Sequence, residues 1–451
     1  MSWPVFGAVA KVYNYLAANL SPARAAKIDG VVPWADKSWV SNADSNAVAF
    51  TPAQLANASP NPAGNVGVAG ASFSPDGVHL AIAHNTTPYI SIYKRAGDAY
   101  SKLPNPAALP SFHGTCAEFS RSGDYLVVGQ FTESPFFRIY KRSGDTFTML
   151  ADPATLPAGP VAGAAWSPDD SMLAVAHSGS PFVTIYQRSG DTFTKLANPA
   201  NLPPNSGHGA AWSPDGAYLV ITNLGTSPFR TIYKVSGTTF TRLTTVGTNP
   251  ASGCYACAFS PNGNLLAISE EASPFIGLYS RSGDTFTRLA NPSTLPLVLG
   301  YDVEFSGDGR YLLVGHATAT SQRAFTVYEI SGNTFTFVSA IIYPIVSNLA
   351  SAGVAVSPDS KHMAIGVNNT VNLFKTTPQD RFVATGSGYL VGLNLAGLDS
   401  KVLITVDGTK QVVVDGVEVS AFPIRFEQSL VVGTNATNYD SHKHIVSVVM
   451  D

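Results

Sequence analysis

Two glutamates occupy the same place in two copies of a phrase that recurs along this chain. Glu118 and Glu304 each come directly before a Phe-Ser pair, and Asp302 lies close to Glu304. The other copies carry small residues at this place: Ser72, Ala165, Ala211 and Ala258. Paired carboxyl groups at about 5 to 10 Å suit glycoside hydrolysis. A glycan-cleaving site is therefore one hypothesis, although the two copies are not adjacent in the repeat and isolated carboxylates are often only solvated.

A second set of polar residues lies at the end of an apolar run in each copy of the repeat. The aligned positions are His84, Gln130, His177, Asn223, Glu270, His316 and Val367. Six of these seven are polar, and we predict that they form a ligand-binding ring where loops emerge from a rigid scaffold. The alternative is that each side chain holds its own following loop by hydrogen bonds.

Two histidines near the C-terminus form a candidate metal site. His442 and His444 are separated by one residue, so in a strand both imidazoles face the same side. In a trimer, three such pairs would offer six nitrogens to a transition metal, which resembles the tips of some phage fibres. The alternative is a solvated surface pair. We predict no other cofactor, and we interpret Cys254 and Cys257 as small buried residues.

The recurring phrase itself predicts the fold. It reads Phe-Ser-Pro-Asp-Gly or a close variant, and its serines are Ser74, Ser120, Ser167, Ser213, Ser260, Ser306 and Ser357. A period in the forties built from strand and turn signals is typical of a β-propeller. We therefore predict an all-β protein with a seven-bladed β-propeller over residues 45–378.

Each repeat contains four predicted strands. Small residues precede the phrase, an apolar run such as residues 218–221 follows it, and a Ser-Pro-Phe loop leads to a third strand such as residues 185–188. A Ser-Gly-Asp turn then reverses the chain into an alternating outer strand such as residues 192–196. For the last blade, we predict that residues 47–57 supply the outer strand and close the ring; the alternative is residues 381–384.

These repeats resemble the WD40 family in their period, in the Ser-Pro-Asp-Gly turn and in an aromatic residue in the third strand. Tyr-Lys replaces the family's Trp-Asp pair, and its Gly-His signal survives only as Gly207-His208. The resemblance thus implies the propeller fold and not the family's regulatory partners.

Both ends of the chain differ from the repeats. Residues 1–44 carry a helical apolar stripe and three tryptophans, so we predict a short helical attachment segment. Residues 20–29 are similar to a phrase in tail and fibre proteins of tailed bacteriophages. Residues 379–451 alternate polar and apolar residues between Asp-Gly turns, which predicts a small β-domain. Residues 419–432 resemble short β-modules that end some phage tail proteins, often as trimers.

Composition excludes some partners. Charged residues make up 13% of the chain and the net charge is −3, so we expect no nucleic-acid partner. The N-terminal apolar stretch is too short to span a bilayer, so we expect no membrane insertion.

Together these features predict a structural virion protein rather than an enzyme. The resemblances imply a tail-fibre-like adhesin, assembled in the host cytoplasm and exposed on the particle surface. Its expected partners are other virion proteins through residues 1–44, a host-surface receptor such as a glycan, and further copies in a homotrimer. The alternatives are a capsid-decorating or head-fibre protein, a glycan-cleaving propeller and a cellular WD40-like hub.

Overall fold

The computed structural model describes residues 53–62, 66–244, 246–296, 298–316, 323–342, 353–367, 370–375, 383–384, 402–406 and 410–414. The chain divides into two compact units. One comprises residues 50–376, and the other combines residues 1–49 with residues 377–451.

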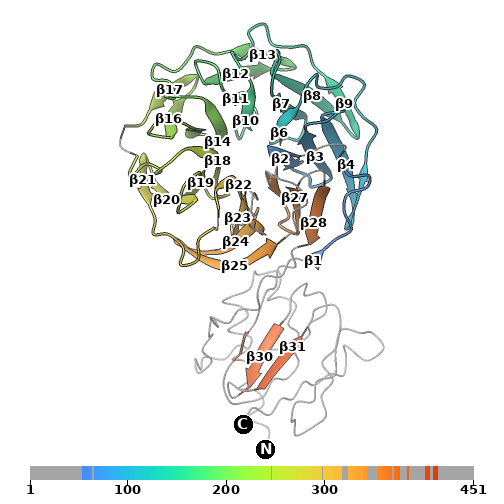
Figure 1. The fold of residues 1–451 in the computed structure, drawn as a ribbon, viewed down its shortest axis with the longest axis vertical. Coiled ribbons are helices and arrows are strands. Elements are labelled where there is room, and N and C mark those ends of the chain that lie inside the picture. The colour runs from blue at the N-terminus through green and yellow to red at the C-terminus, as the bar shows by residue number, and fades with distance from the viewer. Residues whose placement is uncertain are drawn as a thin grey trace, which may run out of the picture. The chain divides into compact units, whose positions relative to one another are not determined.

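The first unit is a seven-bladed β-propeller, as the repeat predicts. Its inner strands surround the centre of the ring in Figure 1. They are β2 (Val66–Phe73), β6 (Gly114–Phe119), β10 (Val161–Trp166), β14 (Gly207–Trp212), β18 (Cys254–Phe259), β22 (Gly300–Phe305) and β26 (Gly353–Val356). We number the blades 1 to 7 in this order.

Each inner strand pairs antiparallel with a second strand, and that strand pairs with a third. The second strands are β3 (His79–His84), β7 (Tyr125–Gln130), β11 (Met172–His177), β15 (Tyr218–Asn223), β19 (Leu265–Glu270), β23 (Tyr311–His316) and β27 (His362–Val367). The third strands are β4 (Ile90–Ala96), β8 (Phe137–Ser143), β12 (Val183–Ser189), β16 (Arg230–Ser236), β20 (Ile276–Ser282), β24 (Arg323–Ser331) and β28 (Thr370–Lys375).

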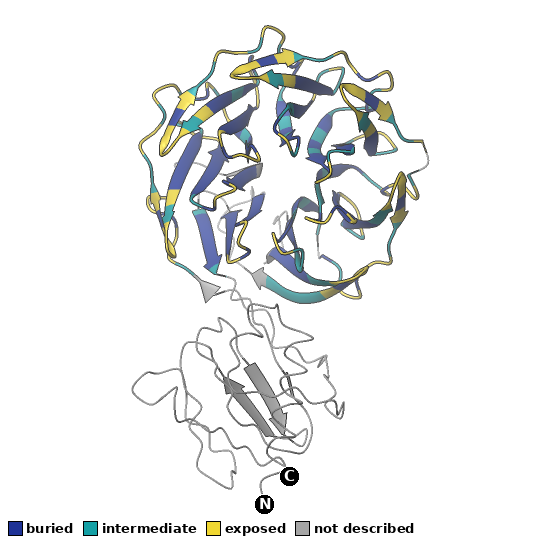
Figure 2. Ribbon diagram, turned by 180° about the vertical axis from the view of Figure 1, so that it is seen from behind, coloured by how far each residue is buried: buried dark blue, intermediate teal, exposed yellow. Residues whose placement is uncertain are grey.

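The outer strands of blades 1 to 6 lie at the rim of the ring (Figure 1). They are β5 (Ala99–Lys102), β9 (Thr146–Met149), β13 (Thr192–Lys195), β17 (Thr239–Arg242), β21 (Thr285–Arg288) and β25 (Thr334–Ile342). Their polar residues face solvent while one aromatic ring, such as Phe193, is buried. Figure 2 shows this change from buried inner strands to exposed rim.

The ring closes as predicted from residues 47–57. β1 (Ala53–Gln54) is the outer strand of blade 7, with Ala53 opposite Lys375 of β28. The chain then crosses to blade 1, where Ser59 N–H donates to the Tyr100 carbonyl at 3.2 Å. One short segment therefore joins the last blade to the first.

Antiparallel pairing divides the propeller into two faces. The Ser-Pro-Asp-Gly and Ser-Gly-Asp turns lie on one, which we call the turn face. The loops between second and third strands and the links between blades lie on the other, the loop face.

The hydrophobic core lies between neighbouring blades. Trp166 and Leu173 of blade 3, for example, pack with Tyr125 and Val127 of blade 2. The third-strand tyrosines extend this core to the loop face: buried Tyr186 donates its hydroxyl to the Thr155 carbonyl at 2.9 Å.

In the second unit, β29 (Val383–Ala384) pairs parallel with β30 (Val402–Val406), which pairs antiparallel with β31 (Lys410–Val414). β30 and β31 lie within residues 379–451, for which a small β-domain is predicted. The helical segment over residues 1–44 lies outside the described residues, as does most of the β-domain over 379–451, so both stay predictions.

Candidate binding channel

The inner strands enclose a central cavity of about 850 Å³. Its wall includes residues of all seven blades and of loops at both faces. Because the inner strands run side by side, residues at equivalent strand positions form layers along the channel. The layer near the turn face is acidic, and the layer near the loop face is aromatic.

Glu118 and Glu304 belong to the layer near the turn face, and Asp302 lies deeper in the channel. All three line the cavity. Arg121 lines the same end, at the position that proline occupies in five other blades: Pro75, Pro168, Pro214, Pro261 and Pro358. A guanidinium group therefore lies at the mouth nearest the carboxyl groups.

Two of these acids also hold blade 6 against blade 7. Asp302 Oδ2 accepts the Val354 N–H at 3.0 Å, and Glu304 Oε2 accepts the Val356 N–H at 3.0 Å. These N–H groups lie on the inner edge of β26, where strand pairing leaves them without a backbone acceptor. Asp302 and Glu304 thus have a structural role.

The channel raises the pKa of all three carboxyl groups. Burial raises the pKa of Glu118 to about 7 and that of Asp302 to about 7. Burial, together with the charges of Asp302 and Glu118, holds the pKa of Glu304 well above its usual range. Near neutral pH the Glu118 and Asp302 carboxyl groups are therefore partly protonated.

The layer near the loop face is built from His208, Tyr255 and Tyr301, on the inner strands of blades 4, 5 and 6. The His208 and Tyr255 rings meet edge to face with centroids 5.4 Å apart, and Tyr255 meets Tyr301 at 4.7 Å. Burial lowers the pKa of His208 to about 4 and raises that of Tyr255 to about 12, so both side chains are neutral at pH 7.

Loops extend this aromatic layer to the surface. His113 and Phe131 both line the channel, and the Phe131 N–H donates to the His113 carbonyl at 3.0 Å. Phe131 is 55% exposed, and it stands alone among the described residues as an exposed large hydrophobic side chain. An apolar ring next to neutral hydrogen-bonding groups suits a polar ligand with an apolar face.

The predicted ligand-binding ring is corrected by burial. His84, Gln130, His177, Asn223, Glu270 and His316 are each 0% exposed. Each lies at the end of a second strand, between the inner and third strands of its own blade. A side chain without exposed surface cannot contact a ligand while the blade is folded.

These residues instead form polar contacts within their blades. The stated alternative, a hydrogen bond to the residue's own following loop, holds for Asn223, whereas the others bond different elements. His84, His177 and His316 bond through Nε2 to third-strand hydroxyls, at 3.0 Å from Ser91, 2.9 Å from Thr184 and 2.8 Å from Thr326.

Two of the other three members hold loops, and the third pairs with an outer strand. Gln130 Oε1 accepts the Ser111 N–H at 2.6 Å, and Asn223 Nδ2 donates to the Thr226 carbonyl at 2.8 Å. Glu270 forms an ion pair with Arg288 at 2.8 Å.

No group of three or more His, Cys, Asp or Glu side chains suited to a metal occurs among the described residues. His442 and His444 lie outside that part of the chain, so the metal site at a trimer axis stays a prediction. Cys254 and Cys257 are buried and carry free thiols, as expected.

Sequence reasoning missed the aromatic layer. His208, Tyr255 and Tyr301 stand where blades 2 and 3 have Thr115 and Ala162, so aligning the second residue of each inner strand would have revealed them. No comparable signal marks Phe131, because its exposure depends on how its loop folds.

Comparison with known families supports the fold. Residues 204–345 match the model of a family described as lactonase, 7-bladed beta-propeller. This match spans blades 4 to 6, less than half of the chain. No curated protein matches the sequence closely enough to serve as a relative. In the described part of the chain, no helix is long and apolar enough to cross a membrane. The chain is therefore a seven-bladed β-propeller that is similar, over three blades, to the lactonase propellers.

Proposed function

We propose that this propeller is a binding protein whose ligand, a saccharide of a cell surface, enters the loop-face end of the central channel. The observation that carries the proposal is the aromatic layer, formed by His208, Tyr255 and Tyr301 and continued by exposed Phe131. A sugar ring presents an apolar C–H face to aromatic rings and hydroxyls to neutral donors and acceptors.

The proposed function is still adhesion, as predicted from the sequence. The proposed binding site is now the loop-face end of the channel instead of the buried ring that includes His84. The tail-fibre-like role, the virion partners, the homotrimer and the particle-surface location belong to the same proposal. Their support is the phage-like phrase at residues 20–29, which lies outside the described residues. If residues 1–44 attach the protein to a particle, a truncation starting near Ser41 will fold normally and fail to join the particle.

A binding assay tests the proposed site. Immobilised saccharides from bacterial surfaces are incubated with the purified protein and with the variants Phe131→Ala and Glu118→Gln. Phe131→Ala removes an exposed ring, so it leaves the fold intact and weakens saccharide binding about tenfold, the equivalent of about 1.4 kcal/mol. Glu118→Gln changes the opposite end of the channel and serves as the matched control. Equal binding by wild type and Phe131→Ala would count against the proposal.

A second candidate function is hydrolysis of a lactone in the same channel. The similarity of residues 204–345 to lactonase propellers supports it, as does the raised pKa of Glu118, since a carboxyl group with a pKa near the working pH is an effective general base. Glu118 would take a proton from the water that attacks the ester carbonyl, and Arg121 would stabilise the resulting oxyanion.

Assays of sugar lactones distinguish the two candidates. If the channel is hydrolytic, wild type opens the lactone ring and Glu118→Gln does so at least about a hundredfold more slowly. If the channel only binds, neither protein accelerates ring opening above the buffer rate.

A further inference from the structure

A repeated ion pair joins neighbouring blades on the turn face. The aspartate of the Ser-Pro-Asp-Gly turn in one blade pairs with an arginine near the end of the third strand in the next, and we call this the seam pair. The seam pairs are Asp76 with Arg142, Asp215 with Arg281, and Asp359 with Arg95.

The two carboxylate oxygens of a seam aspartate have different tasks. In blade 7, Asp359 Oδ1 accepts the Lys361 N–H of its own turn at 3.0 Å, while Oδ2 accepts Arg95 of blade 1 at 3.1 Å. Asp76 divides its oxygens the same way, with Oδ1 on the Val78 N–H and Oδ2 on Arg142. One oxygen therefore shapes the turn and the other binds a guanidinium group.

The seam between blades 3 and 4 keeps the aspartate but lacks the arginine. Asp169 Oδ1 accepts from the Ser171 N–H at 3.0 Å and from the Ser167 hydroxyl at 2.6 Å, as in the other turns. The position of the arginine holds Val235. Among the residues that the structure describes, Asp169 takes part in no ion pair.

A second set of charged contacts is also missing at this seam. At the seam between blades 4 and 5, Asp284 accepts from the Tyr218 hydroxyl and forms an ion pair with Lys234 at 2.7 Å. The three corresponding residues between blades 3 and 4 are Thr238, Met172 and Gln187.

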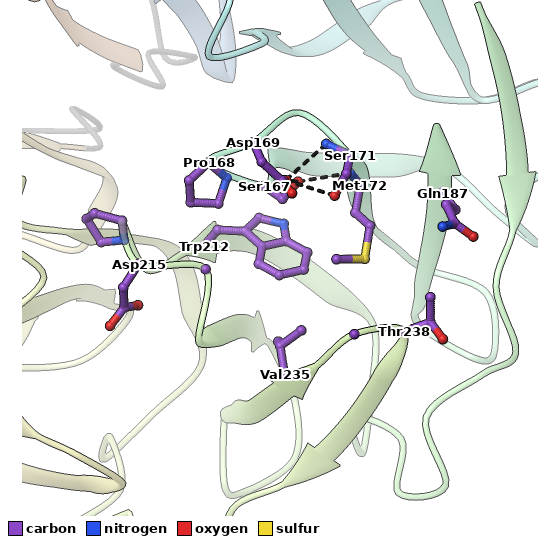
Figure 3. A pocket seen from close by; sticks show the side chains of 13 residues that line it. Ser167, Pro168, Asp169, Ser171, Met172, Gln187, Trp212, Asp215, Val235 and Thr238 are labelled. Carbon is purple, nitrogen blue, oxygen red and sulfur yellow. Dashed lines mark hydrogen bonds between the residues drawn. The ribbon is translucent and has the colours of Figure 1, made fainter. Parts of the chain in front are cut away.

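These replacements leave a cavity of about 420 Å³ between the two blades. Figure 3 shows Asp169, Gln187, Val235 and Thr238 around it, with the Trp212 ring in its wall. Trp212 is 4% exposed, and its Nε1 has no hydrogen-bond partner among the described residues. The corresponding Nε1 of Trp166 donates to the Glu118 carbonyl at 3.2 Å.

We propose that the cavity between blades 3 and 4 binds a guanidinium group supplied from outside the propeller, which pairs with Asp169 Oδ2 as an arginine does at the three seams that have a seam pair. A free small molecule and an arginine side chain of another protein share this chemistry. Gln187 and Thr238 add neutral acceptors at the rim, and the walls of Met172 and Val235 accommodate the aliphatic stem.

The test uses the full chain and two capped amino acids as probes. N-acetylarginine amide carries the guanidinium group, and N-acetylcitrulline amide has nearly the same shape without the charge. Calorimetric titration will detect binding of the arginine probe with a Kd of about 1 mM, as befits one partly solvated charged pair. It will detect at least about tenfold weaker binding of the citrulline probe. Equal binding of the two probes, or no binding of either, overturns the proposal.

Three variants locate the site. Asp169→Asn retains the turn acceptor and removes the charge, so it loses the arginine probe. Val235→Arg supplies the missing seam arginine from within the chain, so it also loses the probe. Asp76→Asn, at a seam already filled by Arg142, serves as the control and keeps probe binding. Unchanged binding by Asp169→Asn overturns the proposal whether or not Val235→Arg folds. Tighter binding of an arginine-containing peptide than of the free arginine probe, lost in Asp169→Asn, would assign the site to a protein partner.

Discussion

At the scale of single residues, a polar side chain at the end of a strand can serve the interior rather than the surface. His177 has no exposed surface, and its Nε2 lies 2.9 Å from the Thr184 hydroxyl on the next strand. Burial lowers its pKa to about 4. The folded blade therefore contains a neutral imidazole that links two strands.

Replacing this histidine tests its structural role. His177→Ala leaves a cavity and deprives the Thr184 hydroxyl of its partner, so we expect it to lower the free energy of unfolding by about 2 kcal/mol. Urea denaturation measures this loss. A variant as stable as the wild type would mean that the imidazole contributes little to stability. The polar residues at the same position in other blades would then need another explanation.

The same residue predicts a pH dependence. The unfolded chain protonates His177 below its ordinary pKa of about 6.5, while the folded chain does so only near 4. The unfolded state thus binds more protons in this window, and the contribution of His177 to stability falls as the pH drops from 6.5 towards 4. The His177→Asn variant has no imidazole to protonate. Its free energy of unfolding relative to the wild type should therefore increase as the pH is lowered from 6.5 to 4. A difference in melting temperature between the two proteins that stays constant with pH would contradict the lowered pKa of His177.

Glu118 predicts the opposite trend. Its folded pKa of about 7 lies above the ordinary value of 4.5, so the folded state binds more protons between these values and loses stability as the pH rises. Glu118→Gln removes this ionisation. Its melting temperature relative to the wild type should increase from pH 5 to pH 8 and stay level below pH 4. A difference that stays constant over that range would show that Glu118 ionises as freely in the folded channel as in the unfolded chain.

At the scale of elements, the turns of neighbouring blades are matched. Blade 3 has Asp170 at the left-handed position where blade 4 has Gly216, with φ of 56° and 70° respectively. Asp170 accepts the Arg121 and Ser122 N–H groups of blade 2 at 2.6 and 2.7 Å. Gly216 faces the turn of blade 3, where Pro168 takes the position that Arg121 has in blade 2. Proline has no N–H to donate.

Two reciprocal substitutions test this matching. Asp170→Gly relieves backbone strain of about 1 kcal/mol but leaves two N–H groups without an acceptor, so we expect a net loss of about 2 kcal/mol in unfolding free energy. Gly216→Asp adds the strain and can gain one such bond at most, from the Asp169 N–H, so it should cost up to about 1 kcal/mol. Denaturant titrations of both variants provide the comparison. A stabilising effect of either substitution would disprove the proposed matching between the turns of neighbouring blades.

The elements were largely predictable from the sequence, while the proposed binding site was not. Turn chemistry and strand period are local, so the repeat located the strands and the closing segment at residues 47–57. Exposure is a property of packing between blades. His84 and Phe131 both follow apolar runs in the sequence, yet the first is buried and the second is 55% exposed.

At the scale of the whole molecule, the ring depends on one short closing segment. Deleting residues 1–48 removes nothing that pairs with the propeller in the described structure, whereas deleting residues 1–57 also removes β1 and exposes the edge of β28. We expect the shorter deletion to melt within a few degrees of the full chain, and the longer deletion to melt far lower and to aggregate. Equal melting temperatures would mean that β1 is dispensable for closure.

The central claim is that a saccharide ligand enters the propeller at the loop-face end of its channel. Its most direct test is an experimental structure of the protein with a saccharide bound. We predict electron density for a sugar ring against Phe131, Tyr255 and Tyr301, with no sugar contact to His84 or His177. Density beside Glu118 and Glu304 at the turn-face end, or on the outer rim, would contradict the account.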